Sequence, residues 1–391
     1  MNGIFDPQKR AIIAIIAAVT VMAMSLSLSI PLISLSLERR EIGSDIIGLM
    51  GAMPAIAFLI ASPFIPSLTR YFGTGCMLWS ALVLSSVSII ALALSDNLIF
   101  IFALRLAIGF AIAILFLISE TWLNQIADDK NRGRTVAIYI SSMTCGFALG
   151  PVLINILGTE GAVPFIVSGL IISSAGIFFY FARDTFPNLS GHSQFSILTF
   201  VKIAPLICAA ILLVAFFDGS ILTLLPVYGV KNGMTENTAV LMSSLLLAGN
   251  IALQFPIGWL ADRMQREKVI LICGLIGLAG ALLLPIVINI PILLWPMLVI
   301  WGGAVVGTYT LALVMMGQTF KGAELVTANA AAGVLWGLGS LIGPSSAGVA
   351  MEVIEPHGMP LSFAFICFLF VLIAAHQAHK IHKEKTSLRK A

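Results

Sequence analysis

The sequence is poor in charge. Only 10% of its 391 residues are Asp, Glu, Lys or Arg, against roughly 25% in soluble domains. Apolar residues make up 59%, and they recur in runs close to the roughly 20 residues that cross a bilayer as a helix. The net charge of +3 gives no reason to expect nucleic acid as a partner. This composition indicates a polytopic helical membrane protein, and the alternating ten-residue strands of a membrane barrel are not visible.

The sequence also lacks the usual sets of catalytic and cofactor-binding residues. No phosphate-binding G-x-x-x-x-G-K-[ST] loop and no nucleophile–His–acid set occurs, and the five histidines are spread over loops, linker and tail. The five cysteines lie in apolar segments without metal-ligand spacing, so we expect small core residues. We therefore predict no enzyme, no cofactor and no metal.

Twelve spans fit the apolar runs, approximately at 11–37, 45–68, 75–95, 98–122, 135–158, 162–182, 205–229, 237–260, 269–289, 293–317, 325–350 and 361–378. With the N-terminus inside, only three of the 21 Lys and Arg lie in outer loops: Arg39, Arg40 and Lys231. Because cytoplasmic loops carry the excess of Lys and Arg, both termini are predicted to be cytoplasmic. The expected location is the bacterial inner membrane.

Three sequence markers repeat at one spacing. Gly146-x-x-x-Gly150-Pro151 returns as Gly339-x-x-x-Gly343-Pro344, an offset of 193. The segment 66–73 aligns with 258–265, and Gly109 with Gly302, at offsets of 192 and 193. The repeat predicts two pseudo-symmetric six-helix bundles, at residues 1–182 and 205–391, joined by a cytoplasmic linker at 183–204.

These motifs resemble those of the major facilitator superfamily over essentially the whole chain. Gly258-x-x-x-Asp262-Arg263 resembles its loop motif between helices 8 and 9, and Arg105-x-x-x-Gly109 its helix 4 motif. The glycines and proline of the predicted fifth span resemble the helix 5 motif of exporters, although the trailing glycine pair is missing. Arg70 stands where many relatives have an acid. The combination of Arg105, Glu120 and Asn131-Arg-Gly-Arg134, with a basic residue at position 70, most resembles the YcaD-like branch.

Two charged residues lie well inside predicted spans. Asp218 falls about 13 residues from the inner end of its span and Arg105 roughly 10 Å from the outer end, at 1.5 Å per residue. The resemblance implies that helices 1, 4, 7 and 10 line a cavity, so we expect these two to face each other near it. Such a carboxyl group can exchange a proton as its access to water changes. The alternatives are a structural acid and an arginine that reaches the headgroups.

Further residues complete the predicted site. Phe217, Trp336 and Tyr309 are expected to line the cargo pocket, with core or lipid-facing positions as the alternative. A cytoplasmic gate is predicted from Glu120, Arg70, Arg132, Arg134, Asp262 and Arg263, although positive-inside topology alone explains most of these arginines. The two Gly-x-x-x-Gly-Pro motifs are predicted to be close helix contacts, either static or sliding.

We therefore predict a secondary transporter that moves a small apolar or amphipathic molecule by alternating access, as a proton-coupled exporter (an antiporter). Its expected partners are the cargo, protons and the bilayer, and we expect a monomer. Two alternatives stay open. The chain could be a metabolite importer or uniporter, or a membrane sensor or scaffold that transports nothing.

Overall fold

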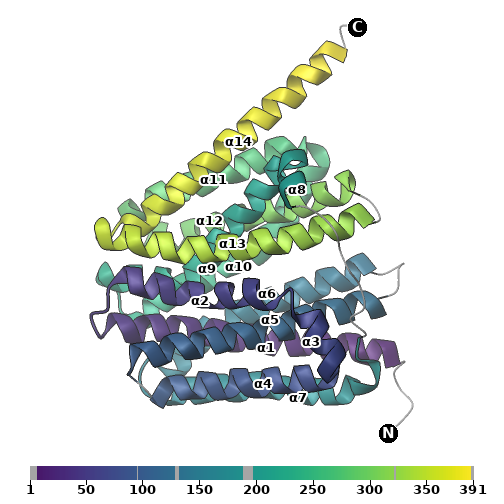
Figure 1. Cartoon of the computed structure of the whole chain (residues 1–391). Helices are drawn as coiled ribbons and strands as arrows, with labels where there is room; N and C mark the ends of the chain where they lie inside the picture. The colour runs from purple at the N-terminus through teal and green to yellow at the C-terminus, as the bar shows by residue number, and fades with distance from the viewer. Residues whose placement is uncertain (1–6, 95, 128–131, 188–196, 321–322, 389–391) are drawn as a thin grey trace. The chain divides into compact units, whose positions relative to one another are not determined.

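The computed structural model describes residues 7–94, 96–127, 132–187, 197–320 and 323–388 (Figure 1). Regular structure in these ranges is helical throughout. Twelve helical segments among them are long and apolar enough to cross a membrane, which confirms the predicted number of spans. Helices suit such sequences because lipid offers no hydrogen bonds to the backbone, and a helix satisfies its own N–H and C=O groups.

The chain divides into two compact units, which are described separately. Unit 1 comprises Met1–Ile42, Met50–Gly191 and Glu236–Ser244, and unit 2 comprises Gly43–Leu49, His192–Thr235 and Leu245–Ala391. The first turns of α2 thus belong to unit 2, and the first turns of α10 belong to unit 1. The predicted domain boundaries at 182 and 205 stay a prediction.

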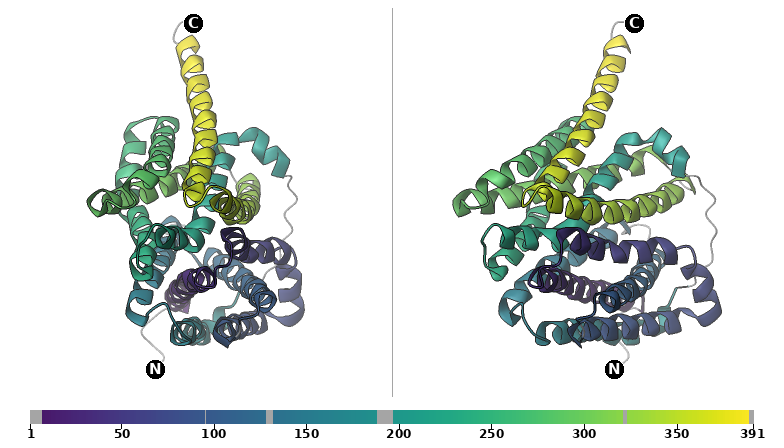
Figure 2. Two further views of the ribbon diagram at one scale, coloured as in Figure 1. Left: turned by 90° about the vertical axis from the view of Figure 1, so that its left-hand side faces the viewer. Right: turned by 60° about the vertical axis from the view of Figure 1, so that its left-hand side comes forward.

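The helices of the first half of the chain are α1 (Pro7–Glu38), α2 (Ser44–Ala61), α3 (Ile65–Phe72), α4 (Thr74–Ala91), η1 (Leu92–Leu94), α5 (Leu98–Ile126), α6 (Arg132–Leu157), α7 (Val163–Ala182) and η2 (Arg183–Thr185). Those of the second half are α8 (Ile197–Ile203), α9 (Pro205–Lys231), α10 (Glu236–Arg263), α11 (Arg266–Val287), α12 (Pro291–Thr319), α13 (Ala323–Val353) and α14 (Gly358–Leu388). In unit 2, α14 continues beyond the helices on which it packs (Figure 2).

The second predicted span is shorter than the sequence suggested. Residues 45–68 were expected to form one helix, but α2 ends at Ala61 and the short amphipathic α3 begins at Ile65. Two prolines explain the break, because Pro63 and Pro66 cannot donate the backbone N–H that a continuous helix needs. Gly73, with φ +82°, then turns the chain from α3 into α4.

Each unit is built around one buried helix. In unit 1, α1 packs against α5, α6 and α7, and in unit 2, α9 packs against α12, α13 and α14. Of the twelve spans α9 is the most enclosed, with 78% of its most apolar stretch buried. The helices α1 and α9 occupy equivalent positions in the two halves of the sequence, as the predicted repeat requires.

The close contacts predicted at the Gly-x-x-x-Gly-Pro motifs are present in both units. A Cβ atom on Gly146 would lie 2.3 Å from the Thr20 carbonyl oxygen of α1, and one on Gly150 would lie 2.0 Å from Ser27 Oγ. In unit 2, a Cβ on Gly343 of α13 would lie 2.4 Å from the Phe216 carbonyl oxygen of α9. Backbone therefore meets backbone at these sites, which side chains larger than glycine would prevent.

The interior of each unit is stabilised by different side chains. In unit 1, Ser25 and Ser168 join α1 to α7, each hydroxyl donating to the other residue's carbonyl at 2.8–2.9 Å. In unit 2, Phe217, Trp301 and Phe363 form an aromatic cluster with ring centroids 5.0–5.6 Å apart. Trp301 Nε1 also donates to the Gly277 carbonyl oxygen at 2.9 Å, which satisfies the polar end of the indole.

The cysteines are only partly core residues. Cys208, Cys273 and Cys367 are buried, whereas Cys76 and Cys145 are exposed. For these two the prediction of core positions was wrong, because an apolar segment of a membrane helix also presents residues on its outer face.

Replacing Gly343 by Ala should destabilise the protein, because the added methyl group overlaps the α9 backbone. We expect the free energy of unfolding to fall by about 1–3 kcal/mol, measured as a lower melting temperature in detergent. Gly333→Ala on the same helix is the matched control, since a Cβ there meets no atom within 4 Å. Equal effects of the two substitutions would contradict the packing role of Gly343.

Candidate functional site

Arg105 is a buried cation for which the described part of the chain shows no ion pair. It lies in α5, is 2% exposed, and its Nε and Nη1 atoms form no hydrogen bond with the described residues. Gly109 lies one turn further along the same face, where a Cβ would come within 2.6 Å of Pro54 Cα in α2. The face of α5 that contacts α2 at Gly109 therefore also carries a guanidinium group, whose N–H groups can donate to an anion.

Arg105→Met should raise the stability of the protein while abolishing transport. An uncompensated cation inside a membrane span costs free energy. Its removal should therefore raise the free energy of unfolding by about 2–3 kcal/mol. The measurement is the melting temperature in detergent. Arg183→Met, at an exposed arginine whose guanidinium lies 4.8 Å from the Tyr180 ring centroid, is the control and should bring no such gain.

The opposite outcome for Arg105→Met is equally informative. A lower melting temperature would show that the guanidinium makes a stabilising interaction in the folded protein. Arg105 would then be a structural residue.

The far end of α5 carries a second polar cluster. Glu120 is exposed, and Tyr139 of α6 is buried. Trp122 is fully buried against Phe179 and Phe186, with ring centroids 6.2 and 5.1 Å away. The Tyr139 hydroxyl and Trp122 Nε1 form no hydrogen bond with the part of the chain that the structure describes. These donors give this end of unit 1 unused hydrogen-bonding capacity.

The predicted gate residues are found in both units. In unit 1, Arg70 is exposed on α3 and donates to Ser67 Oγ at 3.2 Å. In unit 2, Asp262 is exposed, and the Arg263 guanidinium lies 3.9 Å from the centroid of the Trp259 ring. The side chains of Arg132 and Arg134 lie outside the described residues. The gate itself stays a prediction.

Asp218 lies midway along α9, thirteen residues from each end of Pro205–Lys231. It is half-buried, and its carboxyl group has no hydrogen bond or ion pair with any described residue. The next residue, Gly219, lies against α13, where a Cβ would be 3.1 Å from Ser340 Cα. A titratable acid therefore borders the close contact between α9 and α13.

The predicted pocket aromatics fall into two groups. Phe217 is 1% exposed within the aromatic cluster of unit 2, a packing position. Tyr309 of α12 and Trp336 of α13 are half-buried, with ring centroids 5.4 Å apart in a T-shaped arrangement. Beside Tyr309, the Thr310 hydroxyl is 3.4 Å from Gln254 Nε2, which also donates to Asn250 Oδ1. The contribution of these residues to a cargo site stays a prediction.

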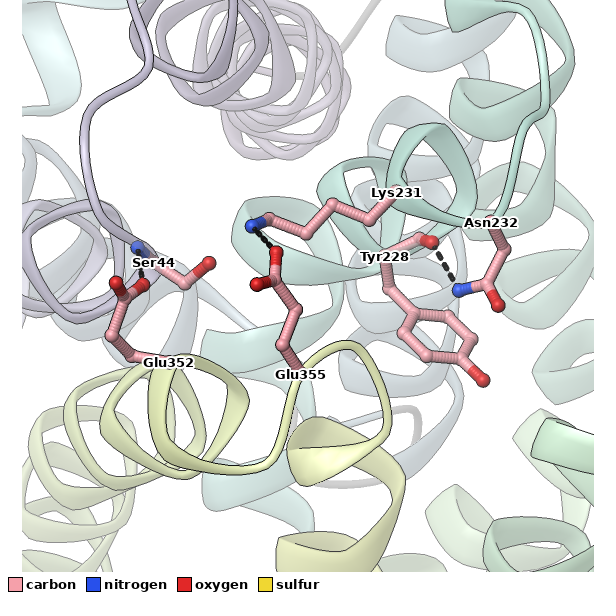
Figure 3. Close-up of polar contacts among 6 residues, drawn as sticks. All are labelled: Ser44, Tyr228, Lys231, Asn232, Glu352 and Glu355. Atoms are coloured by element: carbon pink, nitrogen blue, oxygen red, sulfur yellow. Dashed lines mark hydrogen bonds and ion pairs between the residues drawn. The ribbon is translucent and has the colours of Figure 1, made fainter.

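A polar cluster that the sequence did not reveal lies in unit 2, where Figure 3 shows Ser44 beside Glu352 and Lys231 beside Glu355. The Ser44 backbone N–H at the start of α2 donates to Glu352 of α13 at 2.8 Å. Lys231 pairs with Glu355 at 2.5 Å, and the Tyr228 hydroxyl lies 3.1 Å from His357 Nδ1. An acid from α13 thus satisfies a backbone donor that the start of α2 would otherwise leave open.

Glycines bring α2 and α13 together beside this cluster. A Cβ on Gly48 would lie 2.1 Å from the Pro344 carbonyl oxygen, and one on Gly348 would lie 2.4 Å from the Ser44 carbonyl oxygen. The glycines were visible in the sequence, since Gly48 lies in the first turns of α2 and Gly348 lies five residues after Gly343 in α13. It pointed to no partner, because helix pairing between distant segments is not encoded in spacing alone.

Gly348→Leu should separate the first turns of α2 from α13. In a background with Cys76 and Cys145 replaced by Ala, a short bifunctional thiol reagent should cross-link Ser44→Cys to Glu352→Cys, and the added Leu should abolish that product. Gly333→Leu serves as the control and should leave cross-linking intact. Full cross-linking with Gly348→Leu would contradict the packing described.

Comparison with known proteins gives one family and one fold. The Major Facilitator Superfamily model matches residues 14–249 and 207–390. The chain is 30% identical over 354 residues to the uncharacterized MFS-type transporter YfkF of Bacillus subtilis, covering 87% of this chain and 88% of that protein. It is 26% identical over 281 residues to the uncharacterized MFS-type transporter YcaD of Escherichia coli, covering 71% and 72%.

Solved structures share the architecture at low identity. A bacterial homologue of the human lysosomal transporter Spinster, inward-facing and unoccupied, superposes with a TM-score of 0.75 at 12% identity, over 96% of each chain. A mutant of the nucleoside transporter NupG gives 0.73 at 14% identity, over 95% of this chain and 99% of that one. These likenesses concern the fold alone.

Proposed function

The chain belongs to the Major Facilitator Superfamily, and from this we propose that it exports a small amphipathic molecule in exchange for protons, by alternating access. Family membership makes it an integral membrane transporter of a small molecule, and not an enzyme. The proposal concerns the coupling ion, the direction and the chemical class of the cargo.

The observation that carries proton coupling is Asp218. A carboxyl group in the middle of a span, half-buried and without a partner among the described residues, has no structural bond to lose when it takes up a proton. Its free energy therefore depends on whether water can reach it, which is what changes in alternating access. A purely structural acid would be expected to accept hydrogen bonds from its neighbours.

The amphipathic character of the cargo is supported by the chemistry of the predicted site residues. Arg105 carries guanidinium donors without a hydrogen bond among the described residues, and Tyr309 and Trp336 form a half-buried aromatic pair near the Gln254 amide. A cation suits an anionic or polar group, and the aromatic faces suit an apolar body. Export is supported by the glycine contacts of α6, which match the helix 5 motif of exporters in part.

We propose further that both termini are cytoplasmic in a bacterial inner membrane and that the protein works as a monomer. The distribution of Lys and Arg over the loops supports the orientation. The two units each enclose a core of their own within one chain, which supports the monomer.

Asp218→Asn should abolish flux driven by a pH gradient and leave cargo exchange intact. Candidate cargoes are first selected by the rise in melting temperature that binding produces. Flux into proteoliposomes is then measured with and without an imposed pH gradient, and exchange is measured with cargo on both sides and no gradient. The amide keeps the shape of the carboxyl group but cannot release a proton, so only the gradient-driven component should disappear.

Asp184→Asn is the matched control. Asp184 is exposed, and its ion pair with Arg10 at 3.5 Å contributes little to stability. Gradient-driven flux that survives Asp218→Asn would exclude Asp218 as the coupling residue. Exchange without any gradient dependence in the unmodified protein would identify a uniporter. Binding without flux would identify a sensor.

A further inference from the structure

A cavity of about 280 Å³ lies in unit 1, on the side that the charge pattern predicts to be outer. It is formed where α1 and η1 end and where α5 and α7 begin. Apolar residues such as Leu37 and Phe165 line its interior, and Arg39, Arg40 and Asp96 line it with charge. Pockets for drug-sized ligands measure roughly 300–1,000 Å³, so this cavity suits a smaller polar group.

Each arginine of the cavity lies beside an acid. Arg39 Nη1 pairs with Glu236 at 2.6 Å, and its Nη2 donates to the Thr159 carbonyl oxygen at 3.0 Å. Arg40 donates to the Asp96 carbonyl oxygen, and its Nη1 lies 3.8 Å from Asp96 Oδ1. Among the lining residues, Arg40 and Asp96 thus place a cation beside an anion, an arrangement that favours a zwitterion over a simple anion.

Asp96 and Arg40 are the pair available to a ligand. The Asp96 side chain is 98% exposed, and among the residues that the structure describes its carboxylate contacts Arg40 alone, at 3.8 Å. The Arg40 side chain keeps 30% of its surface exposed. A guanidinium and a carboxylate are thus presented side by side, each able to form a charge-assisted hydrogen bond.

The position of the two arginines is also unusual for this chain. Only three of the 21 Lys and Arg fall in the predicted outer loops, and Arg39 and Arg40 are two of them. Basic residues are rare on that side of the predicted topology, and these two lie together at one cavity. The cavity opens beside exposed apolar residues at the ends of spans, with Leu94 78% and Val163 58% exposed.

We propose that this cavity binds the headgroup of an aminophospholipid, such as phosphatidylethanolamine. The phosphate accepts hydrogen bonds from Arg40, the primary ammonium donates to Asp96, and the acyl chains lie along Leu94 and Val163. The exposed apolar rim favours a lipid over a free phosphorylated amine, which would leave that rim in water. The site is independent of the cargo and of the coupling residue.

Native mass spectrometry of the full-length protein from nanodiscs tests the site. The discs contain equal amounts of phosphatidylethanolamine, phosphatidylcholine and phosphatidylglycerol. The unmodified protein should retain about three times as much phosphatidylethanolamine as phosphatidylcholine. That ratio corresponds to the free energy of one exposed charge-assisted hydrogen bond. Asp96→Asn should remove this preference, and Arg40→Gln should lower retention of all three lipids.

Asp184→Asn is the control, because it removes an exposed carboxylate of unit 1 that does not line the cavity. Equal retention of the three lipids, a preference for phosphatidylglycerol, or a preference unchanged by Asp96→Asn would overturn the proposal. Thermal stabilisation by soluble glycerophosphoethanolamine equal to that by the lipid would also overturn it, because the ligand would then be the soluble compound.

Discussion

Direct contact between helix backbones is the interaction on which both halves of this protein depend. Helices in lipid gain little from burying apolar side chains against one another, so close approach at small residues carries much of their association. Gly146 and Gly150 provide it for α1, and Gly343 provides it for α9. The central helix of each unit is thereby held at a fixed rotation, which determines which of its side chains face the interior.

That fixed rotation makes a comparison between the halves meaningful. At the repeat offset of 193, Asp218 of α9 corresponds to Ser25 of α1. Ser25 is fully buried and hydrogen-bonded to Ser168, whereas Asp218 is half-buried and has no partner among the described residues. The same position of the repeat thus holds a hydrogen-bonded hydroxyl group in unit 1 and, in unit 2, a carboxyl group without a hydrogen bond among the described residues. This difference between the halves, more than the charge itself, makes Asp218 a candidate functional residue.

Sequence patterns predicted the features governed by local physics. Apolar runs gave the twelve spans, because the bilayer dictates their length, and the repeated glycines gave the close contacts of α6 and α13 with their central helices. Pro63 and Pro66 also indicate the break after Ala61, but the apolar residues around them suggested one continuous span. Here backbone chemistry outweighed hydropathy.

The rest depended on pairing between distant segments. The contact of Ser44 with Glu352 joins residues 308 positions apart, and no periodicity specifies such a partner. Phe217 precedes Asp218, but adjacent residues of a helix point about 100° apart, and no sequence pattern indicates that Phe217 packs on Trp301. The pairing of Arg263 with Trp259 was predictable from their spacing of four residues.

The uneven burial of the thiols has a practical consequence. Both exposed cysteines, Cys76 and Cys145, belong to unit 1, whereas the three buried ones belong to unit 2. A maleimide dye or a mercury compound applied to the native protein will therefore mark one half of the molecule and spare the other. A spectroscopic label on these cysteines would therefore distinguish unit 1 from unit 2 without any introduced cysteine.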